Sequence, residues 1–225
     1  MALYPLNLRI DGRLCVVIGG GEVAARKTRS LLSCGARVRV ISPVVVAEIA
    51  RLAAMAKITW EQRPYCHGDL VGVLLAFAAT DTPTVQAEII REAQARGVLL
   101  NSADDQTGSD FHVPATVRRG DLLMTVSTGG ASPALSAAIR KRLEGEYGQE
   151  YLGIVELFRR IRQRVVPDGE SQAEHQLLFQ SLLRLNIVDH ARTGNWSQVA
   201  TILSQVLPAG FEIPALLQGL AEAGR

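Results

Sequence analysis

The sequence predicts an α/β protein: a doubly wound parallel sheet in the N-terminal half, then a β-hairpin, then an α-helical C-terminal region. Two observations carry this prediction. Up to about residue 110, short unbroken apolar runs alternate with segments of helical spacing, and such runs are typical of strands buried on both faces. Beyond that point, two extended stretches precede a chain that reads almost wholly helical to its end.

The first half alternates strand and helix. Residues 14–18 form an apolar run that a glycine follows, and residues 22–34 place apolar side chains on one face of a helix that Gly35 ends. Pro83 suits the first turn of a later helix, and Gly97 stops that helix. The remaining predicted strands are residues 38–41, 58–62, 71–79 and 98–101, and the remaining predicted helices are residues 44–56 and 83–96.

The second half begins with a hairpin. Residues 111–117 and 122–127 read as extended stretches, and the Arg-Arg-Gly-Asp sequence between them reads as their turn. Ser132 and Pro133 then fit the N-cap and the first position of a helix. We therefore expect three regions, which comprise residues 1–112, 113–145 and 146–225.

The composition is that of an ordinary folded chain. The 225 residues include 24 Lys and Arg against 22 Asp and Glu, and this balance argues against a nucleic-acid-binding protein with a large basic excess. No apolar run reaches the ~18 residues of a membrane helix, and the N-terminus lacks a signal-peptide pattern. We expect a cytoplasmic protein without nucleic-acid or membrane partners. Three cysteines without a CxxC pair, and histidines without metal-ligand spacing, predict no permanent metal site.

A glycine-rich loop lies between the first strand and the first helix. Gly19, Gly21 and Ala24 match the GxGxxG/A pattern of a Rossmann domain. The first glycine permits a tight turn, the second lets the backbone approach a pyrophosphate, and the helix N-terminus offers its N–H groups to the phosphates. The alternative is a glycine-rich turn without a ligand. The predicted cofactor contacts of this loop are Gly19, Gly20, Gly21, Glu22 and Val23.

The end of the second strand leaves the nucleotide undecided. An NAD site usually has an acidic residue there, but this sequence reads Val-Ile-Ser-Pro. Ser42 could bond a ribose hydroxyl. Arg37 or Arg39 could favour the 2′-phosphate of NADP, or could be solvated charges at a strand edge. The choice between NAD and NADP stays open at this point.

Polar residues follow the later strands, where ligands of such sheets bind. Thr80 and Asp81 follow one strand, and Asn101, Asp104 and Asp105 follow the next. Asp104 is well placed to act as a base near a nicotinamide. The alternatives are that Asp81 caps the following helix and that the other two carboxylates form a turn.

A second glycine turn, over residues 128–133, opens a helix in the second half. The turn could receive a carboxylate or approach the cofactor, because a helix N-terminus binds anions. The alternative is a plain capped turn.

Four motifs together resemble a known family. These are residues 19–27, residues 79–81, Asn101-x-x-Asp104 and residues 126–133, and they occur in this order and spacing in the precorrin-2 dehydrogenase / sirohydrochlorin ferrochelatase family. This is the dehydrogenase–chelatase module of siroheme synthases. The resemblance covers residues 1 to about 145 firmly and the helical remainder more loosely.

The resemblance implies an activity and a set of site residues. The enzyme would oxidise precorrin-2 to sirohydrochlorin with NAD as hydride acceptor, and many members also insert ferrous iron to give siroheme. Asp104 matches the residue thought to accept the proton and to take part in chelation, where it could contact the metal transiently. The resemblance implies a homodimer built by the hairpin and helical regions. Ser42, Thr80, Asp81 and Asn101 join the cofactor contacts.

Some family members carry a second, phosphorylated serine in the Val-Ser-Ser-Gly-Gly segment, and this chain has Thr128 there. A hydroxyl is retained at that position, but regulation by phosphorylation at Thr128 stays open.

The implied regions are an NAD-binding Rossmann domain (1–112), a dimerisation region (113–145) and a helical substrate and dimer domain (146–225). Because precorrin-2 carries eight carboxylates, its pocket should be basic, and residues 113–164 hold nine basic and five acidic residues. For chelation, His112 is an alternative base. The predicted substrate contacts are Thr128, Gly129, Gly130, Ser132, Arg118, Arg119 and Arg140. Two other functions stay open: a nucleotide-sensing regulatory module, and another small Rossmann dehydrogenase.

Overall fold

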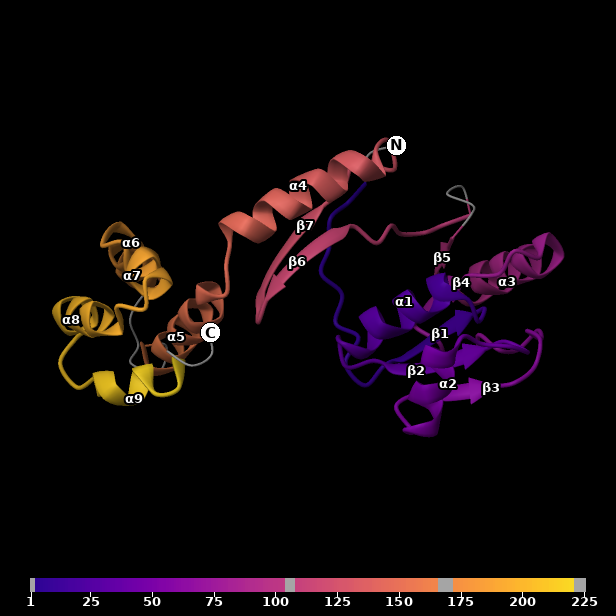
Figure 1. The fold of residues 1–225 in the computed structure, drawn as a ribbon, viewed down its shortest axis with the longest axis horizontal. Coiled ribbons are helices and arrows are strands. Elements are labelled where there is room, and N and C mark those ends of the chain that lie inside the picture. The colour runs from indigo at the N-terminus through magenta and orange to yellow at the C-terminus, as the bar shows by residue number, and fades with distance from the viewer. Residues whose placement is uncertain (1–2, 104–107, 166–171, 221–225) are drawn as a thin grey trace. The chain divides into compact units, whose positions relative to one another are not determined.

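The computed structural model describes residues 3–103, 108–165 and 172–220, without the side chains of residues 172–175. Two compact units, Met1–Val113 and Pro114–Arg225, divide the chain. Figure 1 shows the first unit in indigo to magenta and the second in pink to yellow. Each unit is described by itself.

In its described residues, the first unit contains a parallel sheet of order β3-β2-β1-β4-β5. Its order reverses between β1 and β4, and ligands of doubly wound sheets bind at such a switch point. The strands are β1 Leu14–Ile18, β2 Arg37–Ile41, β3 Thr59–Glu61, β4 Leu75–Ala78 and β5 Leu99–Ser102, and the helices are α1 Glu22–Leu32, α2 Ala47–Ala54 and α3 Pro83–Arg96.

Both faces of the sheet are buried. Val17 and Val40 pack toward one face with residues of α1 and α2, while Val16, Ala76 and Leu100 pack toward the other face with residues of α3. This two-sided burial explains why the strands read as unbroken apolar runs. The predicted fold class is confirmed: a five-strand Rossmann-like sheet, then a hairpin, then helices.

The predicted boundaries differ most from the observed ones at two strands. The strand predicted over residues 71–79 spans only Leu75–Ala78, because the chain turns before it and Gly72 adopts a φ of +71°. The arginines predicted as part of the hairpin turn belong to the strand instead. The turn itself is at Gly120, whose φ of +57° favours glycine.

A buried carboxylate on α3 holds the segment that leads into β4. Both oxygens of Glu92 accept a hydrogen bond from the Gly68 N–H at 3.0 Å, and Oε1 also accepts from Arg96 Nε at 2.6 Å and from the Leu70 N–H at 3.3 Å. Tyr65 donates its hydroxyl to the same group. Burial alone would raise the pKa of Glu92, but these hydrogen bonds outweigh it, so the pKa is lowered.

Replacing Glu92 by glutamine is expected to lower the free energy of unfolding at pH 7 by about 3 kcal/mol, because the variant leaves a buried charge network incomplete. A lowered pKa in the folded state contributes stability above the unfolded value of about 4.3. The difference between wild type and variant should therefore shrink as the pH falls through the folded pKa. Urea titrations at pH 7 and pH 3 measure this difference in the free energy of unfolding. Glu88→Gln, on the exposed side of the same helix, is the control; equal losses in both variants would contradict the role.

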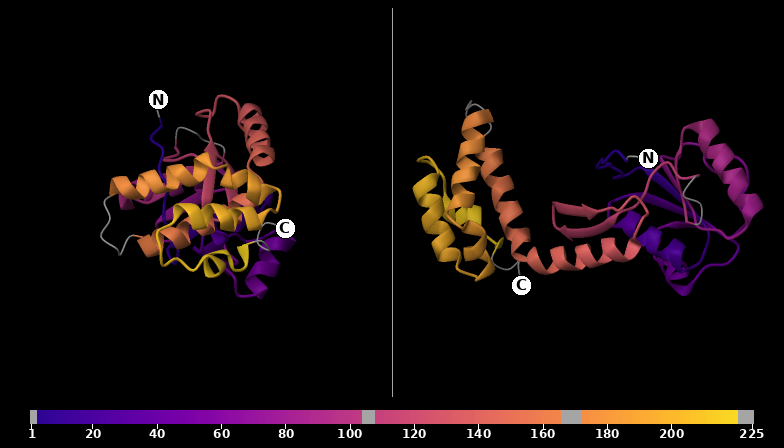
Figure 2. Two further views of the ribbon diagram at one scale, coloured as in Figure 1. Left: turned by 90° about the vertical axis from the view of Figure 1, so that its left-hand side faces the viewer. Right: turned by 90° about the horizontal axis from the view of Figure 1, so that it is seen from above.

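The second unit begins with the antiparallel pair β6 (Ala115–Arg119) and β7 (Leu122–Val126). Helix α4 (Pro133–Glu146) packs beside this hairpin, and the later helices group together beyond it, as Figures 1 and 2 show. These helices enclose a second apolar core around Leu157, Leu182 and Leu203. They are α5 Glu150–Val165, α6 Gln172–Arg184, α7 Ile187–Arg192, α8 Trp196–Val206 and α9 Ile213–Leu217. In the described part of the chain, no helix combines the length and apolarity needed to span a membrane.

Candidate functional site: the carboxyl edge of the parallel sheet

The glycine loop is closely packed at its first two glycines and open at its third. A Cβ on Gly19, whose φ is +127°, would lie 2.1 Å from the Ala79 carbonyl oxygen. A Cβ on Gly20 would lie 1.9 Å from the Val44 carbonyl oxygen. At Gly21, by contrast, no atom of the described residues other than Gly21 and its two chain neighbours lies within 4 Å of a Cβ. The first two glycines are therefore required by packing, whereas the third leaves space above the loop.

Helix α1 starts directly at this open position. Gly21 is its N-cap and offers no side chain to the first turn, and Glu22 and Val23 are exposed. The N–H groups of a first helical turn have no partner inside the helix and lie at its positive dipole end. An open glycine beside such a helix end fits the pyrophosphate of a dinucleotide.

The polar loop after β4 lies at the same edge. Gly19 touches Ala79, and Thr80 and Asp81 follow it, Thr80 half-buried and Asp81 exposed. The alternative that Asp81 caps the next helix is wrong, because the N-cap of α3 is Thr82, whose side chain makes no capping hydrogen bond in the described residues. Asp81 is thus an exposed carboxylate beside the glycine loop.

Asn101, near the end of β5, joins two distant segments. Its Nδ2 donates to the Phe111 carbonyl at 2.9 Å, and its Oδ1 accepts from Lys27 Nζ at 3.1 Å. Lys27 also lies 5.0 Å from the ring centroid of Phe77. Burial, and then the charge of Arg26, lower the pKa of Lys27.

Lys27 is not among the predicted site residues, although it ends the first family motif. Its position in that motif was the only signal in the sequence, because its partner is 74 positions away.

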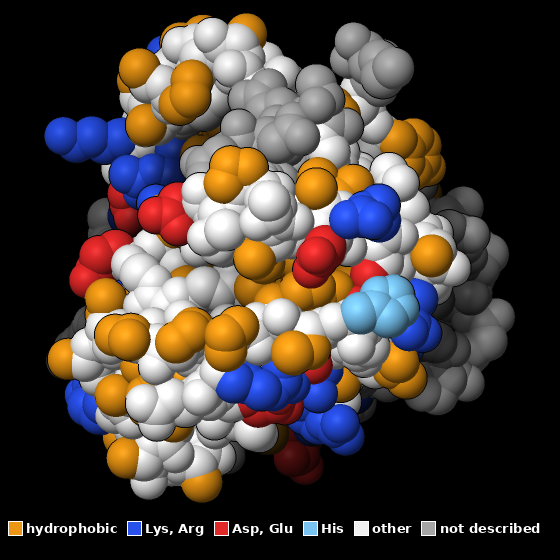
Figure 3. All heavy atoms as spheres, turned by 90° about the vertical axis from the view of Figure 1, so that its right-hand side faces the viewer, with side chains coloured by type: hydrophobic (Ala, Val, Ile, Leu, Met, Phe, Trp, Pro, Cys, Tyr) orange, Lys and Arg blue, Asp and Glu red, His pale blue; other side chains and the backbone are white. Residues whose placement is uncertain are grey.

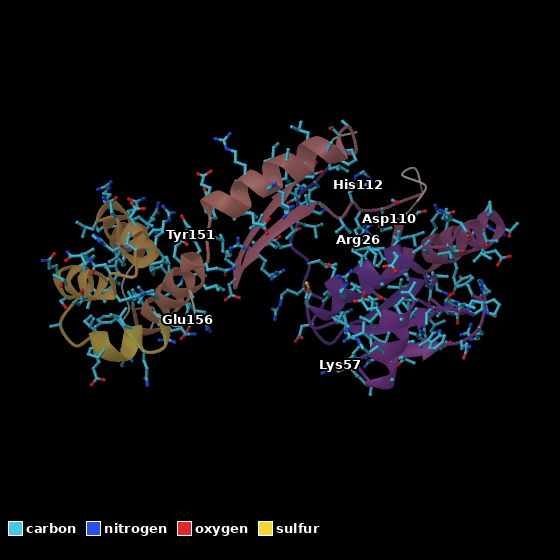
Figure 4. The ribbon with its side chains drawn as sticks, viewed as in Figure 1. Arg26, Lys57, Asp110, His112, Tyr151 and Glu156 are labelled. Atoms are coloured by element: carbon cyan, nitrogen blue, oxygen red, sulfur yellow. The ribbon has the colours of Figure 1, made fainter. Side chains whose placement is uncertain are left out.

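Asp104 and Asp105 lie outside the described residues, but both flanks of that segment are anchored. Before it, the Ala103 N–H donates to the Ala78 carbonyl at 2.9 Å. After it, Asp110 pairs twice with Leu100: its N–H donates to the carbonyl at 2.8 Å, and its Oδ2 accepts from the Leu100 N–H at 2.9 Å. Half-buried His112 follows Asp110, as Figure 4 shows.

The three residues predicted to contact the adenosine ribose or its 2′-phosphate differ in their surroundings. Buried Ser42 donates its hydroxyl to the Val44 carbonyl at 2.7 Å, so only its acceptor capacity is left for a ribose. Arg39 donates to Glu61 Oε1 at 3.4 Å. Arg37 opens β2, at the opposite end of the strand from the glycine loop.

In the second unit, the glycine turn is closed by its own hydrogen bonds. The Thr128 hydroxyl accepts from the Ser132 N–H at 3.1 Å, donates to the Ser132 carbonyl at 3.2 Å, and lies 3.2 Å from Ser136 Oγ. Ser132 caps α4 by accepting from the Leu135 N–H at 3.2 Å. Gly129 and Gly130 are exposed at the turn, with φ values of +61° and +87°.

Arg119 and Arg140, both predicted substrate contacts, donate hydrogen bonds that stabilise α4. Arg119 donates to the carbonyls of Glu144 and Tyr147, both at 3.0 Å, where a cation suits the helix C-terminus. Arg140 Nη1 donates to Glu144 Oε2 at 2.6 Å, one turn along the helix. Arg118 is exposed on β6.

Comparisons with known proteins agree with this arrangement. Residues 6–115 match a family model described as putative NAD(P)-binding, and residues 119–146 match the model "Sirohaem biosynthesis protein central". Siroheme synthase of Pseudomonas aeruginosa (strain LESB58) is 34% identical over 215 residues, which cover 94% of this chain and 45% of the relative. Siroheme synthase of Nitrosococcus oceani is 32% identical over 211 residues, with the same coverage. The chain is similar to the dehydrogenase/chelatase module of siroheme synthases.

This similarity confirms the resemblance seen in the sequence. The chain spans about half the length of the curated relatives that it matches, since it covers 45% of each of the two named here. The solved structure of SirC, precorrin-2 dehydrogenase, matches 91% of this chain and 98% of its own length, with a TM-score of 0.72 and 25% identity. The residues that match the NAD(P)-binding model include the glycine loop and the strand-end residues of the first unit.

Proposed function

We propose that this chain is a precorrin-2 dehydrogenase, which oxidises precorrin-2 to sirohydrochlorin in siroheme biosynthesis with NAD as hydride acceptor. The observation that carries the proposal is the open glycine loop at the switch point, in a chain that matches almost the whole length of SirC, precorrin-2 dehydrogenase. When bound, the nicotinamide takes up the hydride that leaves the substrate. The exposed first turn of α1 holds the pyrophosphate, with Gly19 to Val23 lining it.

The oxidation also releases a proton, and we assign its acceptance to Asp104. One carboxylate beside the nicotinamide is sufficient for this step. The anchors at Ala103 and Asp110 support the assignment, because they tie both flanks of its segment to β4 and β5. Thr80, Asp81 and Asn101 would contact the cofactor at the same edge, and Ser42 its ribose.

Insertion of ferrous iron into sirohydrochlorin is a second proposed step, with the ion as a substrate and Asp104 as its transient contact. Chelation needs a base for the pyrrole protons and no resident metal. In the described residues, no group of three His, Cys, Asp or Glu side chains is arranged to hold a metal ion.

The second unit would bind the tetrapyrrole and form a homodimer. Most of α4 is exposed, including Leu135 at 52% and Ile139 at 39%. Because apolar side chains exposed together on one helix favour association, burying this surface against a second copy would stabilise it. Arg118, Arg119 and Arg140 would meet substrate carboxylates together with the turn of Thr128, Gly129, Gly130 and Ser132.

Incubating the protein with NAD and precorrin-2 tests the proposal. We expect NADH absorbance to appear together with the visible spectrum of sirohydrochlorin, and a further spectral change on adding ferrous or cobaltous ion. NAD binding without turnover would instead support a nucleotide-sensing module. Turnover of another small substrate, with precorrin-2 unchanged, would support a different dehydrogenase.

A further inference from the structure

A cluster of four charged side chains joins β2, β3 and the segment after β3. Arg63 forms a two-pronged pair with Asp69: Nη1 lies 2.8 Å from Oδ2, and Nη2 lies 2.7 Å from Oδ1. Glu61 contacts Arg63 Nη2 through one oxygen and Arg39 Nη1 at 3.4 Å through the other. Arg39 also donates to the Asp69 carbonyl. The two arginines and two carboxylates therefore sum to zero charge.

This cluster adjoins the position where Rossmann domains read the adenosine ribose. That position is the carboxyl end of β2, which Ser42 follows. The Ser42 N–H donates to the Glu61 carbonyl at 3.2 Å, and Trp60 Nε1 donates to the Ser42 carbonyl at 2.9 Å. Two hydrogen bonds thus tie the end of β3 to the ribose-reading position. Arg63 lies two residues beyond β3, and 38% of its side chain is exposed.

An NADP site in this fold holds the 2′-phosphate with an arginine near this point. Here the guanidinium groups of Arg39 and Arg63 are already engaged by carboxylates. Figure 3 shows the same intermingling on the side of the first unit that carries α3, where acidic side chains lie beside most of the basic ones. A 2′-phosphate entering this corner would meet Glu61 and Asp69 together with the arginines. The ribose hydroxyl of NAD carries no charge and avoids that repulsion.

We propose that Glu61 determines the selectivity of this site for NAD over NADP, by neutralising the two arginines that would otherwise receive a 2′-phosphate. The proposal rests on the proposed function, because it assumes that the dinucleotide binds at the glycine loop. In most Rossmann domains an acidic residue at the end of β2 selects NAD over NADP. Here we assign that selection to an acidic residue at the end of β3. Asp69 is buried and fixed by the Cys66 N–H at 2.8 Å, so Glu61 is the more adjustable partner.

Calorimetric binding of NAD⁺ and NADP⁺ to Glu61→Gln tests this. Glutamine keeps the shape of the side chain and removes its charge, which leaves the corner with one net positive charge. We expect NADP⁺ affinity to rise about tenfold, while NAD⁺ affinity changes less than about threefold. Adding Arg63→Met to Glu61→Gln should cancel the gain. If the glutamine variant is destabilised in thermal melts, Glu61→Ser provides the same charge change.

Glu48→Gln is the matched control, because Glu48 pairs with Arg29 at 3.0 Å on the helices α2 and α1, not at a strand end. It should leave both affinities unchanged. Tight NADP⁺ binding by the wild type would overturn the inference. So would a Glu61→Gln variant in which the ratio of NAD⁺ to NADP⁺ affinity is unchanged. In both cases, NAD⁺ binding by the wild type would leave the proposed function in place. Binding of neither nucleotide would overturn both. Altered selectivity without precorrin-2 turnover would overturn only the proposed function.

Discussion

Asp104→Ala is expected to abolish sirohydrochlorin formation, with kcat falling by about 10²–10⁴-fold, while NAD binds with unchanged affinity. The reason is that hydride transfer leaves a proton on the substrate, and without the carboxylate no positioned group accepts it. We assign this role to Asp104 because it matches the family motif Asn101-x-x-Asp104. Stopped-flow or steady-state formation of NADH measures the loss, and calorimetry measures the retained NAD affinity.

The neighbouring carboxylate provides the control for this prediction. Asp105→Ala makes the same change one position further along the chain and should keep most of the activity. Asp104→Asn should be as inactive as the alanine variant, because an amide fills the space but accepts no proton at neutral pH. A fully active Asp104 variant, or an equal loss in the Asp105 variant, would remove Asp104 from the proposed role.

Gly21→Asp is the second change with a large expected effect: NAD binding should be lost, with affinity falling at least about 100-fold. A carboxylate at this position would project into the open space beside the first turn of α1 and would repel the pyrophosphate. The same openness means that the fold should tolerate the substitution. Thermal melting should therefore be nearly unchanged while calorimetry detects no binding.

Two further glycine variants complete this test. Gly145→Asp adds the same charge on α4, where a Cβ also meets open space, and should bind NAD normally. Gly20→Ala should lower the melting temperature, because its Cβ would lie 1.9 Å from the Val44 carbonyl oxygen. Unchanged NAD affinity in Gly21→Asp would show that the dinucleotide does not lie over this loop.

Local patterns in the sequence predicted the elements that local forces decide. The apolar runs of β1 and β4 and the Gly35 and Gly97 stops were readable because burial on two faces and positive φ each leave a mark within a few residues. The strand predicted over 71–79 came out too long, because an apolar run does not reveal where the chain turns. Val71 is 59% exposed although it belongs to that run.

The sequence by itself determined the fold class, the glycine loop and the resemblance to siroheme synthases, because period, glycine placement and motif spacing are properties of short segments. Only the tertiary structure decided what the polar residues near that loop contact. From the sequence, Arg39 could be a phosphate ligand or a solvated charge. Its partner in the structure, Glu61, is 22 positions away along the chain. Asn101 meets Lys27 across 74 positions. Hydrogen bonds and ion pairs act over a few ångströms in space, so their partners are chosen by how the strands align, which no local pattern encodes.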